Sequence, residues 1–273
     1  MCRNHVRWGR TRRGLAARAM TVRLSTDRRL RILLIVLAVI LLPVAGFLIW
    51  ALTPDGPAPE AEGFLRSDGT VEVTTNGELV FRPKNIKPTT GLVFYPGAHV
   101  DPRSYAPLVY RIASAGHLVV IPQMPLNFAI LAPNTAERVV ARFPDVKHWA
   151  VGGHSLGGAT AVKYAATHDV RGLVIFAATP PNDTDLSHRT DLLVTAVFGT
   201  GGIGAEAAAV AKPRLPENTT YVLITGGNHA QFGTYDPSSP EPPASISREE
   251  QQHQAADATI DLLNALADGS PRH

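Results

Sequence analysis

A glycine-rich heptapeptide near the middle of the chain restricts what the chain can fold into. It reads Gly152-Gly153-His154-Ser155-Leu156-Gly157-Gly158, with an apolar segment before it and a helix-favouring segment, residues 159–168, after it. A serine on a tight strand-to-helix turn needs glycine neighbours, because the strained backbone leaves no room for Cβ atoms. Such a turn raises the hydroxyl and directs backbone N–H groups at the helix N-terminus toward it. The pattern therefore predicts that Ser155 is a nucleophile.

Short apolar segments alternate with helix-forming segments from residue 91 onward. The expected strands are residues 91–95, 117–121, 148–151, 171–177, 192–198 and 220–225, and the expected helices are residues 105–115, 135–143, 159–168, 205–211 and 247–267. This alternation predicts an α/β fold, a mostly parallel sheet with helices on both faces. Asn76-Gly77 lies between two segments of strand character and predicts an antiparallel edge hairpin with a two-residue turn. Residues 237–243, rich in proline and serine, are expected to form an exposed loop.

The net charge of +3 conceals an uneven distribution of charged residues. Residues 1–31 hold ten arginines and one acidic residue, Asp27, whereas the rest of the chain has 16 basic and 22 acidic residues and a net charge of −6. No basic helix face in that remainder indicates nucleic-acid binding. The single cysteine, Cys2, excludes disulfides, and the sequence shows no His, Asp and Glu spacing typical of a metal site.

Residues 32–52 form an uninterrupted uncharged segment that as a helix would span about 31 Å, the thickness of a bilayer's hydrocarbon core. Arginines precede it and acidic residues follow it, which predicts a cytoplasmic N-terminus and an extracytoplasmic remainder. A cleaved signal peptide is the alternative, but its apolar core is usually shorter and no small-residue cleavage site follows here. The predicted organisation is a basic tail over 1–31, a transmembrane helix over 32–52, a linker over 53–65 and a globular domain over 66–268, with Met20 as an alternative start.

A serine hydroxyl is a weak nucleophile until a base removes its proton, and in α/β folds of this kind the base follows the last strand. His229 occupies that place, within the glycine-rich segment 226–233. The other histidines after the serine lie on helices, before a strand or at the terminus: His168, His188, His253 and His273. The developing oxyanion needs two N–H donors. We expect these to be Leu156, directly after the serine, and Ala98, in the loop after residues 91–95.

Several segments together resemble the α/β-hydrolase family. They are residues 91–97, residues 119–127, the heptapeptide at 152–158, and residues 226–233 with the later segment 247–251. More narrowly, the chain is similar to the small lidless bacterial members of that family, which are often membrane-anchored. The resemblance covers about residues 50–268 and implies Ser155 as nucleophile and His229 as base, as the residues themselves indicate.

The chain departs from the family pattern at the third catalytic position. The family has an aspartate in a Gly-Thr-x-Asp-Gly context after the penultimate strand, and here Gly202 stands in its place. This acid orients the histidine and stabilises its charged form. Three alternatives remain: Glu206 reaches in from the following helix, Asp183 or Asp185 supplies the carboxylate from the neighbouring strand end, or the site has no acid.

Residues 199–204 also match a Gly-x-Gly-x-x-Gly dinucleotide pattern. Only 69 residues follow Gly204 and no acidic residue ends the next strand, so we expect no cofactor. The predicted function is a membrane-anchored extracytoplasmic serine hydrolase. Residues 177–192 leave no room for a lid, which favours a small-molecule or surface-linked acyl substrate. The alternative is a degenerate hydrolase-fold protein that binds a ligand or partner without catalysis.

Overall fold

The structure of the protein is a computed structural model that describes residues 13–238 and 240–269, with side chains from residue 27 onward. The described chain forms two units, divided between Trp50 and Ala51. Cys2 and His273, on which two of the sequence expectations fall, lie outside the described residues.

The described part of the first unit lies in helix α1 (Arg13–Leu52), which contains Pro43 and ends two residues past the boundary. Its start lies well before residue 32, so part of the basic N-terminal segment is helical. Within α1 the stretch Asp27–Leu52 is long and apolar enough to cross a membrane, a property that it shares with signal sequences near an N-terminus. Proline is tolerated in such a helix when the freed backbone groups are satisfied locally.

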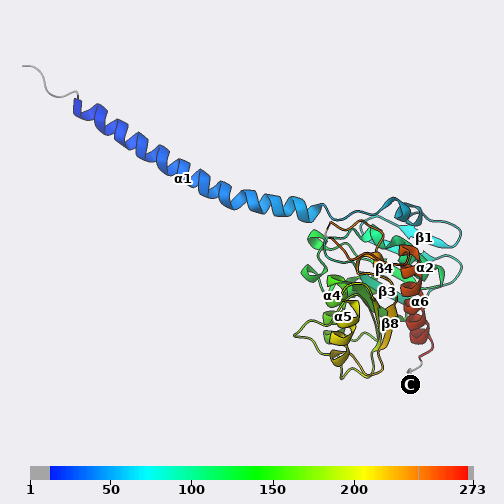
Figure 1. Ribbon diagram of the computed structural model, residues 1–273. Coiled ribbons are helices and arrows are strands. Elements are labelled where there is room, and N and C mark those ends of the chain that lie inside the picture. Colours follow the sequence, from blue (N-terminus) through cyan, green and yellow to red (C-terminus); the bar gives the residue numbers. More distant parts are fainter. Residues whose placement is uncertain (1–12, 239, 270–273) are drawn as a thin grey trace, which may run out of the picture. The chain divides into compact units, whose positions relative to one another are not determined.

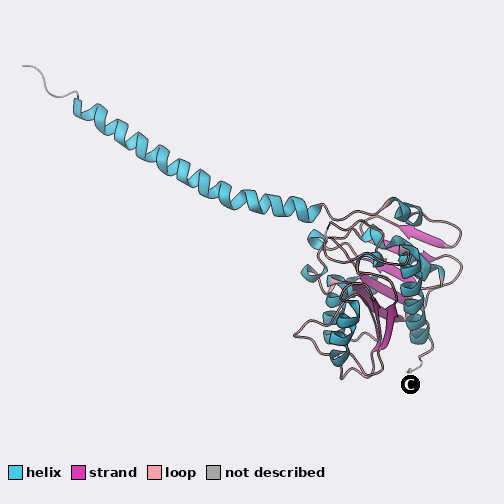
Figure 2. Cartoon of the chain, in the orientation of Figure 1, coloured by secondary structure: helices cyan, strands magenta, loops and turns pink. Residues whose placement is uncertain are grey.

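The second unit is built on an eight-stranded sheet (Figures 1 and 2). The strands are β1 (Val71–Thr74), β2 (Leu79–Pro83), β3 (Thr90–Tyr95), β4 (Leu118–Ile121), β5 (His148–His154), β6 (Gly172–Phe176), β7 (Leu193–Gly199) and β8 (Thr220–Ile224). Their order in the sheet is β1-β2-β4-β3-β5-β6-β7-β8. The β1–β2 and β2–β4 pairs are antiparallel and all other pairs are parallel, which confirms the predicted parallel sheet with an antiparallel edge.

Helices cover both faces of this sheet (Figure 1). One face packs against α2 (Ala106–Ser114) and α6 (Arg248–Ala267), and the other against α3 (Thr135–Arg142), α4 (Leu156–Thr167) and α5 (Gly204–Ala211). Short 3-10 helices complete the unit: η1 (Pro59–Leu65), η2 (Pro102–Tyr105), η3 (Pro125–Asn127), η4 (Ala129–Leu131), η5 (Lys212–Arg214) and η6 (Ala230–Phe232). Successive residues of β3 alternate between the two cores, because side chains on a strand point to opposite faces.

The edge hairpin is present, but its turn differs from the two-residue turn expected at Asn76-Gly77. Thr74 pairs with Val80, so five residues lie between the last paired residues of β1 and β2. A two-residue type I′ turn needs positive φ at both central residues. Only Gly77 adopts it here, with φ +87°, and the longer loop follows.

Residues 53–65, expected as a linker, make ordered contacts with the rest of the second unit. The Asp55 N–H donates to the His99 carbonyl at 2.8 Å, and the Ala58 N–H donates to the Thr234 carbonyl at 2.9 Å. Ala61, in η1, is fully buried. This segment therefore contacts the loop after β3 and the chain after η6, two segments that border the candidate site.

Gly157→Ala tests whether the close approach of α4 to the end of β3 is essential. A Cβ at Gly157 would lie 2.2 Å from the Tyr95 carbonyl oxygen, a backbone atom that has no room to move aside. We expect a loss of unfolding free energy of about 3 kcal/mol or more, although alanine favours helices. Urea denaturation measures it. The matched control is Gly69→Ala, where nothing lies within 4 Å of the added Cβ; equal stability of the two variants would contradict the prediction.

Candidate active site

Ser155 lies on a sharp turn between β5 and α4. Its backbone has φ 53° and ψ −122°, a conformation that side-chain-bearing residues rarely adopt. The Ser155 N–H donates to the Phe176 carbonyl at 2.9 Å, which ties the turn to the end of β6. Gly153, two residues earlier, allows the approach, because a Cβ there would lie 2.5 Å from the Tyr95 carbonyl oxygen. The strand–turn–helix geometry predicted around the serine is therefore present.

His229 follows β8 and directly precedes η6, where its side chain makes no capping hydrogen bond. Its ring centroid lies 4.7 Å from that of His154, the last residue of β5. The His229 carbonyl also accepts a hydrogen bond from His154 Nε2 at 2.9 Å. The fold thus brings the predicted base next to the residue that directly precedes the predicted nucleophile.

A buried chain of hydrogen bonds links three loops at this point. The Gly97 N–H donates to Tyr105 Oη at 2.9 Å, and Tyr105 Oη lies 2.9 Å from His154 Nδ1. Because the His154 Nε2 proton is needed for the His229 carbonyl, Nδ1 is the acceptor and the tyrosine hydroxyl donates to it. The chain joins the loop after β3, the serine turn and the loop after β8.

The electrostatics of these groups agree with neutral side chains. Burial lowers the pKa of His154 well below its ordinary value, and the neighbouring His229 lowers it further. Burial raises the pKa of the Tyr105 hydroxyl well above its ordinary value, so it remains a donor. Burial also lowers the pKa of His229, while the negative charge of Glu241 acts in the opposite direction. A neutral imidazole at His229 is the form that a general base requires.

The two expected N–H donors lie at the start of α4 and in the loop after β3. Leu156 is the first residue of α4, and its N–H belongs to the helix N-terminus. Ala98 lies between two residues whose backbone N–H groups donate hydrogen bonds to other parts of the protein. The Gly97 N–H donates to Tyr105, and the His99 N–H donates to the Asn127 carbonyl at 3.0 Å.

The acidic residues considered from the sequence have other surroundings. Asp183 is exposed and its carboxylate binds Lys163 Nζ at 2.9 Å. Asp185 accepts the Ser187 N–H at 2.8 Å. Glu206 is exposed in the first turn of α5. Gly202 has φ +64°, a left-handed conformation that favours glycine.

The sequence profile of the Alpha/beta hydrolase family matches residues 91–253, more than half of the chain. The chain belongs to the α/β-hydrolase family. No curated protein matches its sequence.

Solved structures share the fold of this α/β hydrolase at low sequence identity. A ferulic acid esterase from Streptomyces cinnamoneus has 16% identity and a TM-score of 0.50, with 70% of this chain and 71% of that chain covered. MenH from S. aureus has 12% identity and a TM-score of 0.53, with 71% and 100% covered. An esterase/lipase from an uncultured bacterium has 10% identity and a TM-score of 0.52, with 76% and 90% covered. At such identities the likeness shows the fold alone.

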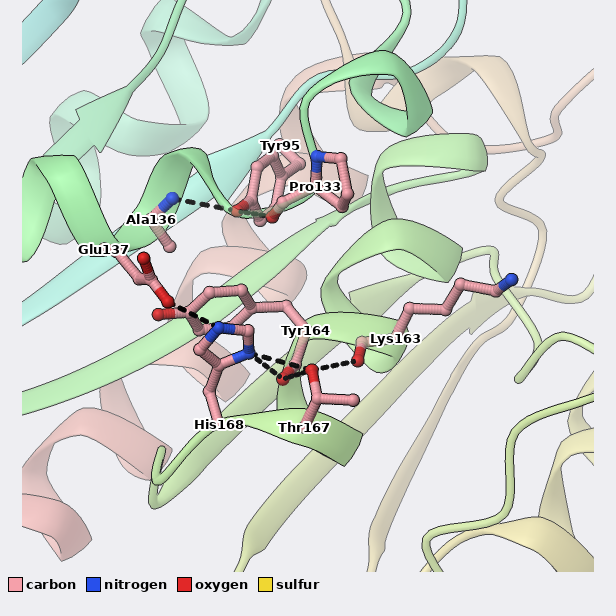
Figure 3. Close-up of polar contacts among 8 residues, drawn as sticks. All are labelled: Tyr95, Pro133, Ala136, Glu137, Lys163, Tyr164, Thr167 and His168. Atoms are coloured by element: carbon pink, nitrogen blue, oxygen red, sulfur yellow. Dashed lines mark hydrogen bonds and ion pairs between the residues drawn. The ribbon is translucent and has the colours of Figure 1, made fainter.

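His168, one of the histidines that the sequence argument sets aside, makes contacts away from the hydrolase turn (Figure 3). Its Nε2 lies 2.6 Å from Glu137 Oε1, and its ring stacks on Tyr164 at a centroid distance of 3.9 Å. These contacts join α3 to the C-terminal end of α4, whereas Ser155 precedes the N-terminal end of that helix.

Sequence reasoning missed three residues that surround the site of the hydrolase. His154 was read only as part of the heptapeptide, Tyr105 only as the start of a helix, and Glu241 only as part of an exposed loop. The partners of His154 are 49 and 75 residues away in the chain, so no local pattern signals them. Glu241 has no periodic signal either, because it lies in a proline-rich segment between η6 and α6.

Tyr105→Phe tests whether the buried hydrogen-bond chain stabilises the hydrolase. The change leaves the Gly97 N–H and His154 Nδ1 buried without their shared partner, which should lower the free energy of unfolding by about 2 kcal/mol or more. Tyr110→Phe is the matched control, since the Tyr110 hydroxyl donates to an exposed aspartate, Asp68. It should change stability by less than about 1 kcal/mol. Chemical denaturation compares the two, and a larger effect at Tyr110 would refute the assignment.

Proposed function

We propose that this α/β hydrolase is a membrane-anchored serine esterase whose catalytic domain lies outside the cytoplasm. The single observation that carries the proposal is the contact of His229 with His154, directly before the strained Ser155. Nucleophilic acyl transfer needs a serine on a sharp strand-to-helix turn and a histidine base, and here the histidine contacts the residue directly before the serine.

In the proposed reaction, Ser155 Oγ attacks the acyl carbonyl carbon while its proton passes to the His229 imidazole. The carbonyl oxygen becomes an oxyanion that the N–H groups of Leu156 and Ala98 stabilise. When the tetrahedral intermediate collapses, the ester C–O bond breaks and the imidazolium protonates the departing alkoxide. Water then attacks the acyl-serine and gives a proton to His229. When the bond between the acyl carbon and Ser155 Oγ breaks, the imidazolium returns that proton to Oγ and the carboxylic acid is released.

The expected substrate is a modest acyl ester, either a small molecule or an acyl group on a larger surface molecule. Residues 177–192 connect β6 to β7 without a helix, so no lid domain is inserted there. Two of the similar structures carry the name esterase, which supports an ester over other acyl compounds.

A non-catalytic role is the second candidate. The observation that favours it is Gly202, which leaves the turn after β7 without the carboxylate that the family pattern has there. In this alternative the domain binds a ligand or partner and turns over no ester.

Ser155→Ala and His229→Gln discriminate between these candidates. We expect a fluorophosphonate probe to label the full-length protein in detergent, and both changes to abolish labelling. Hydrolysis of p-nitrophenyl esters should fall by about 10⁴-fold or more, because nucleophile and base act as a unit. Ser187→Ala, at an exposed serine, is the control and should keep wild-type labelling. A folded wild type that neither reacts with the probe nor hydrolyses esters would establish the non-catalytic alternative.

The membrane anchor is tested by fractionation. We expect the full-length protein to stay with the membrane pellet through alkaline carbonate washing, because 26 residues of α1 are long and apolar enough to span a bilayer. Protease added to spheroplasts should digest the domain, as an extracytoplasmic location requires. A mature protein that begins after residue 52 would identify a cleaved signal peptide, and a domain protected from protease would reverse the orientation.

A further inference from the structure

A side chain in place of Gly202, in the turn after β7, would be strained and crowded. Gly202 adopts φ +64°, and a Cβ there would lie 3.1 Å from Pro242 Cγ. The neighbour that a side chain at position 202 would meet is thus Pro242, in the loop between η6 and α6. Glu241 directly precedes that proline.

This loop is fixed against the segment that carries His229. Asn228 Nδ2 donates to the Pro242 carbonyl at 2.8 Å, and the Ser245 N–H donates to the Gly226 carbonyl at 2.8 Å. Asn228 is buried, and its backbone makes two hydrogen bonds with the side chain of Gln251. The Asn228 N–H donates to Gln251 Oε1 at 2.9 Å, and the Asn228 carbonyl accepts from Gln251 Nε2 at 2.7 Å. The backbone next to Glu241 is therefore attached to the residue next to His229.

Glu241 lies near the segment that carries His229. It is half-buried, and it lines a cavity together with Asn228 and Ala230, the two neighbours of His229. Its negative charge favours the protonated form of the imidazole, against the effect of burial. Among the described residues that line this cavity, the other charged or titratable ones are Arg248 and Tyr235, and the ring of His154 contacts that of His229. Arg248 Nη2 donates to the Tyr235 carbonyl at 3.0 Å and lies 3.5 Å from Asp236 Oδ1.

We infer that Glu241 is the carboxylate that supports His229, supplied by the loop before α6 instead of the turn after β7. This inference rests on the proposed function. Through its carboxylate, Glu241 stabilises the imidazolium that forms when Ser155 passes its proton to His229. It is a positioning residue, because it acts on the substrate only through His229.

Glu241→Gln is the decisive variant, and ester hydrolysis against pH is the measurement. The wild-type kcat/KM should rise with pH as His229 loses its proton, with an acidic limb below the ordinary histidine pKa because burial lowers it. Without the glutamate charge, the pKa of His229 falls further, so the limb moves to lower pH. At the same time the plateau of kcat/KM should fall by about 10²-fold, since the imidazolium loses its counter-charge.

Four further variants separate this role from structural damage. Glu241→Asp keeps the charge and should keep the acidic limb near its wild-type position. Glu217→Gln, an exposed glutamate before β8, should change neither quantity. Glu206→Gln and Asp183→Asn remove the acids considered from the sequence. The inference is overturned if Glu241→Gln leaves the plateau of kcat/KM unchanged, or lowers that plateau without moving the acidic limb. It is also overturned if Glu206→Gln or Asp183→Asn changes the pH profile in the same way as Glu241→Gln.

Titration of the His229 signal by NMR, with ¹³C-labelled histidine in the full-length protein, checks the same contact without activity. The His229 pKa should be lower in Glu241→Gln than in the wild type, and an unchanged pKa overturns the inference. The two proposals fail in different ways. An unlabelled, inactive wild type refutes the esterase and the role of Glu241 with it, whereas an active wild type that Glu241→Gln leaves unaffected refutes only the latter.

Discussion

The buried imidazole of His154 joins the three loops from which the candidate site is built. Its Nδ1 accepts from the Tyr105 hydroxyl and its Nε2 donates to the His229 carbonyl. A protonated imidazole has no acceptor, so charging His154 would break the link to Tyr105. Burial prevents that protonation by lowering the pKa of His154. The position of the His229 backbone thus depends on a side chain that must stay neutral, and a buried network that is fully satisfied gives one arrangement only.

Local signals in the sequence were enough to predict the serine turn and the parallel sheet. The glycines around Ser155 are needed because the sharp turn leaves no room for Cβ atoms, whatever the rest of the chain. Apolar strands that alternate with helices form a mostly parallel sheet. His229 followed from a rule of topology, its place after the last strand. The turn at Asn76-Gly77 was wrong in detail because the preference of a dipeptide is weak beside the register of the strands.

The links within the site were beyond prediction because they join distant parts of the chain. Tyr105 and His154 meet across the end of the sheet, and nothing in either segment specifies the other. The position of Glu241 was equally beyond prediction. Its position relative to His229 depends on the hydrogen bonds of Asn228 and Ser245, which exist only once the loop before α6 has folded back onto the loop after β8.

The backbone of Ser155 bears on the choice between an esterase and a binding module. A positive φ at a residue with a side chain costs about 1–3 kcal/mol, and such strain persists where surrounding structure enforces it. Here β6 holds the Ser155 N–H and glycines admit the turn against the Tyr95 carbonyl. A protein that only bound a ligand would gain nothing from this strain, since an unstrained turn presents a hydroxyl equally well. The strained backbone of Ser155 therefore favours the proposed catalysis, and the glycine at position 202 agrees with the inference that Glu241 supplies the carboxylate from another loop.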